Sequence, residues 1–145
     1  MSEKFPFIDV IVVNYNGKDV LNNFLISLSK INYPKNKIQS ILVDNASSDG
    51  SVDFVKKNYP NVKIIANKKN LGYVGINSAL PYCKGKYAYV INNDIILHKD
   101  CFKKFIGALE KDSSIAMTTY VSINYFDPKI VSGGTWVSRS MYCGH

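Results

Sequence analysis

Residues 8–17, Ile-Asp-Val-Ile-Val-Val-Asn-Tyr-Asn-Gly, decide the fold of this chain. The first six are β-branched except for Asp9, which is typical of a buried strand, and the last four favour a turn. From Lys18 onward, apolar residues recur at the spacing of a helix, until the polar and proline residues at 32–34 end the pattern. The chain therefore opens with a strand, a loop and a helix.

The same alternation continues along the chain. Further strands are predicted at residues 38–43, 62–66, 87–91 and near 115–121. Further helices are predicted at residues 52–59, 71–83 and 102–109, the second short or bent at Pro81 and the third with Asp100 as N-cap. After Tyr120 the pattern loosens, with a turn predicted at 124–128 and a strand-like run at 129–132.

Strands that alternate with helices at this rhythm predict an α/β fold. We expect a mostly parallel, twisted sheet with helices on both faces, joined by right-handed crossovers. The chain has 145 residues, 46% of them hydrophobic and 20% charged, which is the size and composition of one globular domain. We therefore expect residues 1–145 to form a single domain. No capping element precedes His145, so we also expect a truncation at the C-terminus.

The charge of the chain is basic but dispersed. Its 18 basic residues, all Lys except Arg139, outnumber 11 acidic ones and give a net charge of +7. They occur as scattered pairs, without the aromatics and Arg forks of a nucleic-acid surface, so we expect no nucleic-acid partner. An attraction to an acidic membrane surface or to a phosphorylated small molecule stays open.

The sequence also bears on location and redox chemistry. It has no run of about 18 apolar residues and no tripartite signal at its N-terminus, so we expect a cytoplasmic protein, with the inner face of the membrane as an open alternative. Cys83, Cys101 and Cys143 are widely spaced and form no Cys-x-x-Cys pattern. They predict free thiols rather than a disulfide framework or a zinc site.

Polar residues follow each of the first four predicted strands. In an open parallel sheet, ligands bind outside the carboxyl ends of the strands, where the strand order reverses. With the common order 3-2-1-4, Asn14, Asp44 and Asp94 would converge on one crevice. There Asp44 would accept hydrogen bonds from a base or ribose, and Asp94 would hold a divalent cation, although each residue alone fits a turn equally well. Gly72 and Gly75 do not form the Gly-x-Gly-x-x-Gly turn of a dinucleotide-binding dehydrogenase.

Four of these segments form an ordered set of motifs. They are Val-Ile-Val-Val-Asn-Tyr-Asn-Gly at 10–17, Val-Asp-Asn-Ala-Ser-Ser-Asp-Gly-Ser at 43–51, Asn-Leu-Gly at 70–72 and Ile-Asn-Asn-Asp at 91–94. In order and spacing they resemble the family 2 glycosyltransferases of the GT-A fold, closest to the rhamnosyltransferase-like branch, over about residues 6–112. The resemblance implies the donor-binding half of an inverting enzyme, with 113–145 as the start of the acceptor half. Such an enzyme moves a sugar from a nucleoside diphosphate sugar to a polysaccharide, lipid or protein acceptor, as in cell wall or polysaccharide biosynthesis.

The resemblance also implies roles for individual residues. Asn14 and Asn16 would line the base and ribose pocket, Asp44 would contact the base, and Asn70 with Gly72 would shape the rim. The implied nucleotide-binding set is Asn14, Asn16, Asp44, Asn45, Asn70, Gly72, Asn92 and Asn93. Asp94 would take the last position of the family's metal motif and hold Mn²⁺ or Mg²⁺. Because Asn92 stands at the first acidic position of that motif, only one carboxylate is left, and we expect weaker metal binding.

The sequence does not identify the catalytic residues. In the family a carboxylate general base lies in a Glu-Asp-type element of the second half, and no such element follows Asp127. We therefore expect the base beyond His145 and no sugar transfer by this chain alone. Two alternatives stay open, namely a non-catalytic nucleotide-binding or interaction domain and a sugar nucleotidyltransferase, although the latter's Gly-rich loop with Arg and Lys is missing after the first strand. A strand edge near 129–136 also predicts self-association.

Overall fold

The computed structural model describes residues 5–119, 122–124, 126–127 and 131–132. The chain divides into two compact units, Met1–Lys99 and Asp100–His145. The first unit contains a four-stranded sheet with its helices, and the described residues of the second form one α-helix and a short antiparallel strand pair.

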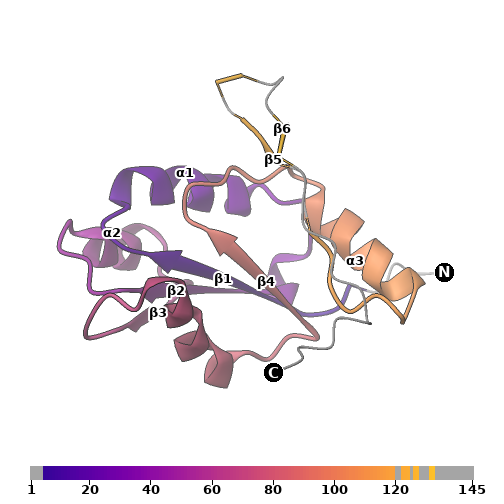
Figure 1. The fold of residues 1–145 in the computed structure, drawn as a ribbon, viewed down its shortest axis with the longest axis horizontal. Coiled ribbons are helices and arrows are strands. Elements are labelled where there is room, and N and C mark those ends of the chain that lie inside the picture. Colours follow the sequence, from indigo (N-terminus) through magenta and orange to yellow (C-terminus); the bar gives the residue numbers. More distant parts are fainter. Residues whose placement is uncertain (1–4, 120–121, 125, 128–130, 133–145) are drawn as a thin grey trace, which may run out of the picture. The chain divides into compact units, whose positions relative to one another are not determined.

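A parallel sheet of order β3-β2-β1-β4 forms the middle of the first unit (Figure 1). Its strands are β1 (Ile8–Asn14), β2 (Ile38–Asp44), β3 (Lys63–Ala66) and β4 (Tyr87–Asn92). In the register of the sheet, Asn14 pairs with Asp44 on one side of β1, and Val13 pairs with Asn92 on the other. The four strands and their order are therefore as predicted, and the strand order reverses between β1 and β4.

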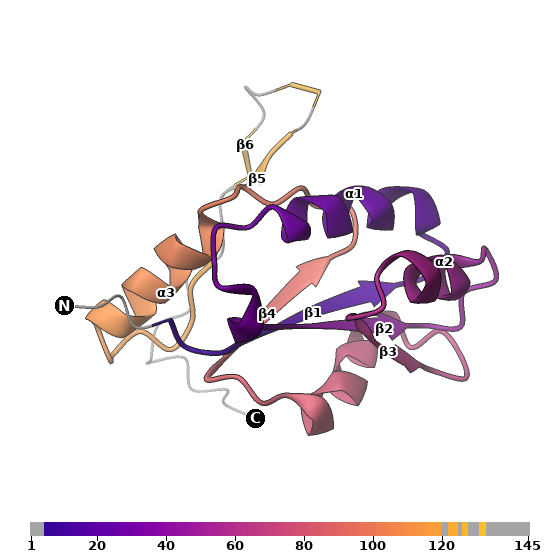
Figure 2. The ribbon, with the colours of Figure 1, turned by 180° about the vertical axis from the view of Figure 1, so that it is seen from behind.

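Helices cover both faces of this sheet, as predicted. The helices α1 (Lys18–Ser29) and α2 (Ser51–Asn58) lie on one face, and the 3₁₀-helix η2 (Gly72–Tyr82), rose in Figure 1, lies on the other, as Figure 2 shows from behind. A single 3₁₀ turn, η1 (Lys35–Lys37), leads into β2. On the η2 face, the buried core consists of Ile11, Ile41, Val43 and Ala79.

The element after β3 is a helix, but it is wound as a 3₁₀-helix and ends at Tyr82. Pro81 lies inside it and removes a backbone donor from its last turn. Gly75 and Ala79 are its buried residues, and their small side chains allow the backbone to approach the sheet closely. The sequence predicted the helix and its irregular end, but not its 3₁₀ winding.

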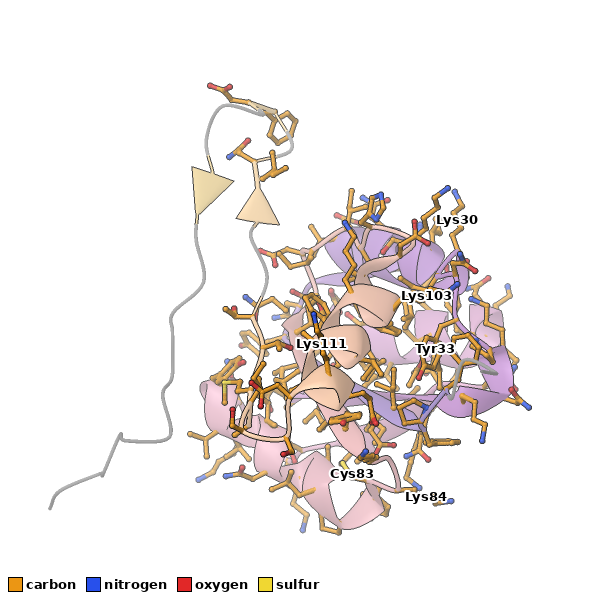
Figure 3. The ribbon with its side chains drawn as sticks, turned by 90° about the vertical axis from the view of Figure 1, so that its right-hand side faces the viewer. Lys30, Tyr33, Cys83, Lys84, Lys103 and Lys111 are labelled. Carbon is orange, nitrogen blue, oxygen red and sulfur yellow. The ribbon has the colours of Figure 1, made fainter. Side chains whose placement is uncertain are left out.

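Asp9, the polar residue in the first strand, has a structural role. It is fully buried, and its Oδ2 accepts the backbone N–H groups of Lys84 (2.7 Å) and Gly85 (2.6 Å). Figure 3 shows Cys83 and Lys84 where η2 gives way to the connection to β4. The carboxylate of Asp9 therefore fixes this connection to β1, at the edge of the sheet opposite the carboxyl ends of the strands.

The second unit begins with α3 (Cys101–Lys111), the helix predicted over 102–109. Asp100 occupies its N-cap position, although its side chain makes no capping hydrogen bond. Phe102 and Ile106 lie one turn apart and are the buried residues of this helix. Burial raises the pKa of the Cys101 thiol to about 11, so the thiol stays protonated at neutral pH.

The strand predicted near 115–121 is wrong for residues 115–119, which form no strand; Tyr120 and Val121 lie outside the described residues. The side chains of Ile115 and Met117 are 37% and 63% exposed. A strand needs a hydrogen-bonded neighbour, and apolar composition alone does not supply one. The pairing found further along joins β5 (Ser122–Ile123) to β6 (Val131–Ser132) in antiparallel register.

The turn predicted at 124–128 is present in its described part. The side-chain oxygen of Asn124 accepts the N–H groups of Phe126 (2.9 Å) and Asp127 (3.1 Å), which is the geometry of an Asx turn. The edge expected near 129–136 lies almost wholly outside the described residues. Over the described ranges, no helix has the length and apolar character needed to cross a membrane.

Candidate nucleotide-binding site

The loops that follow β1 and β2 are joined to each other at the carboxyl edge of the sheet. The N–H of Asn16 donates to Oγ of Ser47 (2.9 Å), and the N–H of Ser48 donates to Oδ1 of Asn16 (2.8 Å). The N–H of Lys18, at the start of α1, donates to Oδ2 of Asp49 (2.9 Å). The two loops therefore form one continuous polar surface above the strand ends.

Asn14 connects three strand ends from a fully buried position. Its Nδ2 donates to Oδ1 of Asp44 and to Oγ of Ser47, both at 3.1 Å, and its Oδ1 accepts from Nδ2 of Asn93 (2.8 Å). Gly17 lies directly against this group, because a Cβ there would overlap Nδ2 of Asn93 and would lie 2.8 Å from Oδ1 of Asn14. The predicted convergence of the first, second and fourth strand exits is thus present, with Asp94 next to Asn93.

Asp44 is held in one orientation by the turn that follows it. It is 2% exposed, and it accepts the hydroxyl of Ser47 on Oδ1 (2.6 Å) and the N–H of Ser47 on Oδ2 (2.9 Å). With the bond from Asn14, three of about four acceptor positions of the carboxylate are filled. The remaining position is on Oδ2. Ser47 was not predicted as a site residue, although the spacing Asp-x-x-Ser is a recognisable signal for a side-chain-stabilised turn.

Asp49 is a second residue of this loop that the sequence did not single out. Its Oδ1 accepts the N–H of Ser51 (3.0 Å) and contacts the Ser51 hydroxyl, while Oδ2 accepts the N–H of Lys18. Burial acts to raise the pKa of Asp49, but the hydrogen bonds from the Ser51 hydroxyl and from these backbone groups outweigh it and lower the pKa below its usual value. Asp49 thus joins the N-terminal turns of α1 and α2.

The backbone of these exits enters the left-handed region at two residues that are not glycine. Asn16 has φ 49° and Ala46 has φ 63°. Asn tolerates this conformation, whereas for Ala it costs about 1–2 kcal/mol. The strained Ala46 lies between Asp44 and Ser47 in the chain. Asp44 accepts two hydrogen bonds from Ser47 and one from Asn14, and these three bonds hold the turn closed. Such strain is characteristic of functional loops.

The structure separates the predicted nucleotide-binding set into two groups. Asn14, Asp44 and Asn45 are buried, and Asn93 is partly buried. The remaining members are exposed, as is the predicted metal ligand; they are Asn16, Asn70, Gly72, Asn92 and Asp94. Tyr15 is an exposed aromatic residue (51%) in the first polar loop, and it was not among the predicted site residues. The buried side chains thus hold the loops in place, the exposed residues form most of the surface that a ligand can reach, and the buried Asp44 keeps one open acceptor position, on Oδ2.

A family model described as "Glycosyl transferase family 2" matches residues 9–141. The chain belongs to this family. Two of its relatives are much longer than the chain. The chain is 29% identical over 141 residues to the poly(ribitol-phosphate) beta-glucosyltransferase of Bacillus spizizenii, which covers 93% of the chain and 21% of the relative. It is 28% identical over 109 residues to the TarS beta-N-acetylglucosaminyltransferase of Staphylococcus aureus, and this match covers 72% of the chain and 19% of the relative. The chain thus spans about a fifth of the length of these two curated relatives.

Solved structures of family 2 enzymes share the fold of this chain. The structure of S. aureus TarS 1–349 in complex with UDP superposes with a TM-score of 0.68 at 26% identity, over 74% of this chain and 33% of that one. The mannosyltransferase PcManGT of Pyrobaculum calidifontis, solved with GDP-Man and Mn²⁺, superposes with a TM-score of 0.72 at 22% identity, over 78% of this chain and 34% of that one. These matches confirm the GT-A fold predicted from the motifs, whereas the rhamnosyltransferase-like branch stays a prediction.

The candidate site contains few metal ligands of its own among the described residues. In the part of the chain that the structure describes, no three His, Cys, Asp or Glu residues group into a metal site. Asp94 and Asn92 are exposed at the end of β4. Mg²⁺ in substrate-phosphate sites is commonly held by one or two carboxylates together with phosphate oxygens and water. The oxygen ligands of Asp94 and Asn92 therefore fit a cation held jointly with a diphosphate rather than by the protein alone.

Proposed function

We propose that this chain is the donor-binding part of an inverting glycosyltransferase and that it binds a nucleoside diphosphate sugar at the carboxyl edge of its sheet. The observation that carries the proposal is the hydrogen-bond chain from Asn93 through Asn14 to Asp44 and Ser47, which joins the exits of β4, β1 and β2. These exits surround the point where the strand order reverses, which is where ligands bind in open α/β sheets. Family membership supports the same location.

Each end of the site suits a different part of the donor. The open acceptor position on Oδ2 of Asp44 suits a ring N–H of the base, and the exposed ring of Tyr15, in the loop after β1, offers a surface for stacking. Asn16 lies in the same loop and suits the ribose. On the other side of Asn14, Asp94 and Asn92 suit the diphosphate and its cation. A bound Mn²⁺ or Mg²⁺ supplies positive charge that stabilises the diphosphate as a leaving group.

The activity of the whole protein is part of the proposal. We propose transfer of the sugar to a hydroxyl of a polysaccharide, lipid or protein acceptor, with the general base outside residues 1–145. A cytoplasmic location close to an acidic membrane surface fits the net charge of +7. A domain that binds nucleotide without transferring sugar is the alternative, and it predicts binding without turnover even in the full-length protein.

Calorimetry on the purified chain tests the site. UDP, GDP and dTDP are titrated separately, with and without Mn²⁺, into wild type and the variants Asp94→Asn, Asp44→Asn and Asp53→Asn. We expect Asp94→Asn to lose the enhancement by metal while its unfolding free energy changes by no more than about 1 kcal/mol. Asp44→Asn should weaken binding with and without metal, because its partner is the base. Asp53, exposed on α2, serves as the control for the loss of one negative charge.

Three results would contradict parts of this proposal. Failure of every nucleoside diphosphate to bind the wild type at millimolar concentration would remove the donor site itself. Metal-enhanced binding that persists in Asp94→Asn would return Asp94 to the class of turn residues. Robust sugar transfer by the purified chain would place a general base within it, and Asp127 would be the first residue to test.

A further inference from the structure

The side chain of Asn45 connects the ends of β2 and β3 to the start of η2. Its Nδ2 donates to the carbonyl oxygen of Gly72 (2.8 Å), and its Oδ1 accepts from Nδ2 of Asn67 (2.9 Å). The Oδ1 of Asn67 in turn accepts the hydroxyl of Ser78 (2.9 Å). Asn45 is 1% exposed, and both its Nδ2 and its Oδ1 are bonded to protein groups, whereas Asp44 keeps an open acceptor position.

Gly75 is the residue that makes room for this amide. A Cβ at position 75 would lie 2.5 Å from Oδ1, 3.1 Å from Nδ2 and 3.2 Å from Cγ of Asn45. Gly75 is not among the glycines with positive φ, so its backbone does not require glycine. The requirement at position 75 comes instead from the amide of Asn45, and the two residues form a matched pair.

The segment that Asn45 holds is otherwise weakly fixed. Residues 68–72 are all exposed and contain no helix or strand before Gly72. Gly72 has φ 58°, and its N–H donates to Oδ1 of Asn70 (2.8 Å), a bond within the segment itself. Segments with few buried apolar contacts open at low free-energy cost. The bond from Asn45 to the Gly72 carbonyl connects this end of the segment to the end of β2.

We propose that Asn45 is a positioning residue that holds the rim at 70–72 ready for the nucleotide without touching the nucleotide, and that Gly75 exists to accommodate it. The inference rests on the proposed function, because the rim borders the donor site only if the donor binds there. A preorganised rim lowers the entropic cost of binding. When the bond from Asn45 is lost, the nucleotide must order the rim itself, and we expect its affinity to fall by about tenfold.

The matched pair allows the loss of packing to be separated from the loss of positioning. We compare wild type, Asn45→Ala, Gly75→Ala and the double variant Asn45→Ala/Gly75→Ala. Both single variants should melt at lower temperature, one because of a cavity and the other because of overlap, and the double variant should recover much of the loss because the new methyl group fills the vacated space. Ser78→Ala is the control, since it removes a 2.9 Å hydrogen bond from the same network and leaves the Asn45 bond to Gly72 in place.

Two measurements are made on each variant: hydrogen–deuterium exchange of the peptide covering 68–74 in the nucleotide-free chain, and the affinity for UDP by calorimetry. We expect the double variant to exchange faster at 68–74 and to bind UDP about tenfold more weakly despite its recovered melting temperature, with Ser78→Ala close to wild type. Unchanged exchange, or wild-type affinity in the double variant, would overturn the positioning role. If the wild type binds no nucleoside diphosphate, the proposed function fails, while the exchange measurement still decides whether Asn45 holds the rim. Asn45→Asp provides the same two readouts if the double variant does not fold, because it keeps the acceptor for Asn67 and loses the donor to Gly72.

Discussion

Replacing Asn14 by Asp should turn a buried hydrogen bond into a pair of facing carboxyl groups. Nδ2 of Asn14 lies 3.1 Å from Oδ1 of Asp44, and the two residues are 0% and 2% exposed. Two like unit charges 3.1 Å apart repel by about 5 kcal/mol at an effective dielectric constant of about 20. The folded variant can avoid this repulsion only by keeping one proton on the pair.

The cost of that proton sets the magnitude. An exposed Asp in the unfolded chain has a pKa of about 3.9, so retaining a proton at pH 7 costs about 4 kcal/mol, at about 1.4 kcal/mol per pH unit. The folded variant binds more protons than the unfolded one, so its deficit in unfolding free energy grows as the pH rises above about 4. We expect the deficit relative to wild type to be about 4 kcal/mol at pH 7 and about 1.5 kcal/mol at pH 5.

Urea unfolding at pH 5, 6 and 7 measures this deficit. The matched control is Asn14→Asp/Asp44→Asn, which moves the amide to the other side of the same contact and leaves a single carboxylate. The control should lose the pH dependence even if it remains less stable than wild type. A loss below about 1 kcal/mol in Asn14→Asp at pH 7, or an equal loss at pH 5 and pH 7, would show that these two side chains do not meet as described.

Three further predictions concern the same loops. Gly17→Ala should lower the unfolding free energy by about 2–4 kcal/mol, because the methyl group displaces Asn93 from the buried oxygen of Asn14. In the Asn93→Ala background the additional loss should be smaller but not zero, because the new Cβ would still lie 2.8 Å from Oδ1 of Asn14; thermal melting of the four proteins checks this. The pKa of Asp49 is lowered from 3.8 in the folded chain, so the stability that wild type has over Asp49→Asn should be present at pH 7 and be lost as the pH falls below about 4. Urea unfolding at pH 7 and pH 3 measures this difference, and an equal difference at the two pH values would contradict the prediction. Gly50→Ala should cost about 1 kcal/mol through its backbone alone, since Gly50 has φ 79° and its Cβ would have only Lys18 Nζ within reach, at 3.9 Å; replacing Lys18 as well should leave that cost unchanged.

The sheet could be predicted from the sequence because its strands carry strong local signals. The β-branched run at 8–13 and the polar residues after each strand leave little choice about where strands end, and the order 3-2-1-4 places those ends together. The run at 115–119 carries a similar apolar signal and is not a strand, because pairing depends on a neighbour that the local sequence does not reveal. The 3₁₀ winding of residues 72–82 was likewise not predicted, since Pro81 indicated only that this helix would be short or bent.

The residue types of the site were predictable, but their directions were not. A polar strand exit shows that Asn14, Asp44 and Asn45 are near the site, yet nothing in the pattern tells which of them turn inward to hold the loops. Burial and hydrogen bonding decide that, and these depend on residues more than 20 positions away, such as Asn67 for Asn45. Ser47 is the opposite case: it was overlooked although it could have been predicted. Its contacts to Asp44 are local, and the Asp-x-x-Ser spacing indicates them.

The carboxylate of Asp9, at the end of the sheet opposite the proposed donor site, affects how β4 is aligned with β1 at that site. By holding the N–H groups of Lys84 and Gly85, it sets where β4 begins beside β1. Because the rise is about 3.3 Å per residue, a slip of two residues at that end would move Asn93 and Asp94 by about 7 Å relative to Asn14, and a slip of one residue would turn them to the other face. In the proposed donor site, the spacing between the residues assigned to the base and those assigned to the diphosphate is therefore set by a strand register that is anchored about 16 Å away, five residues back along β1.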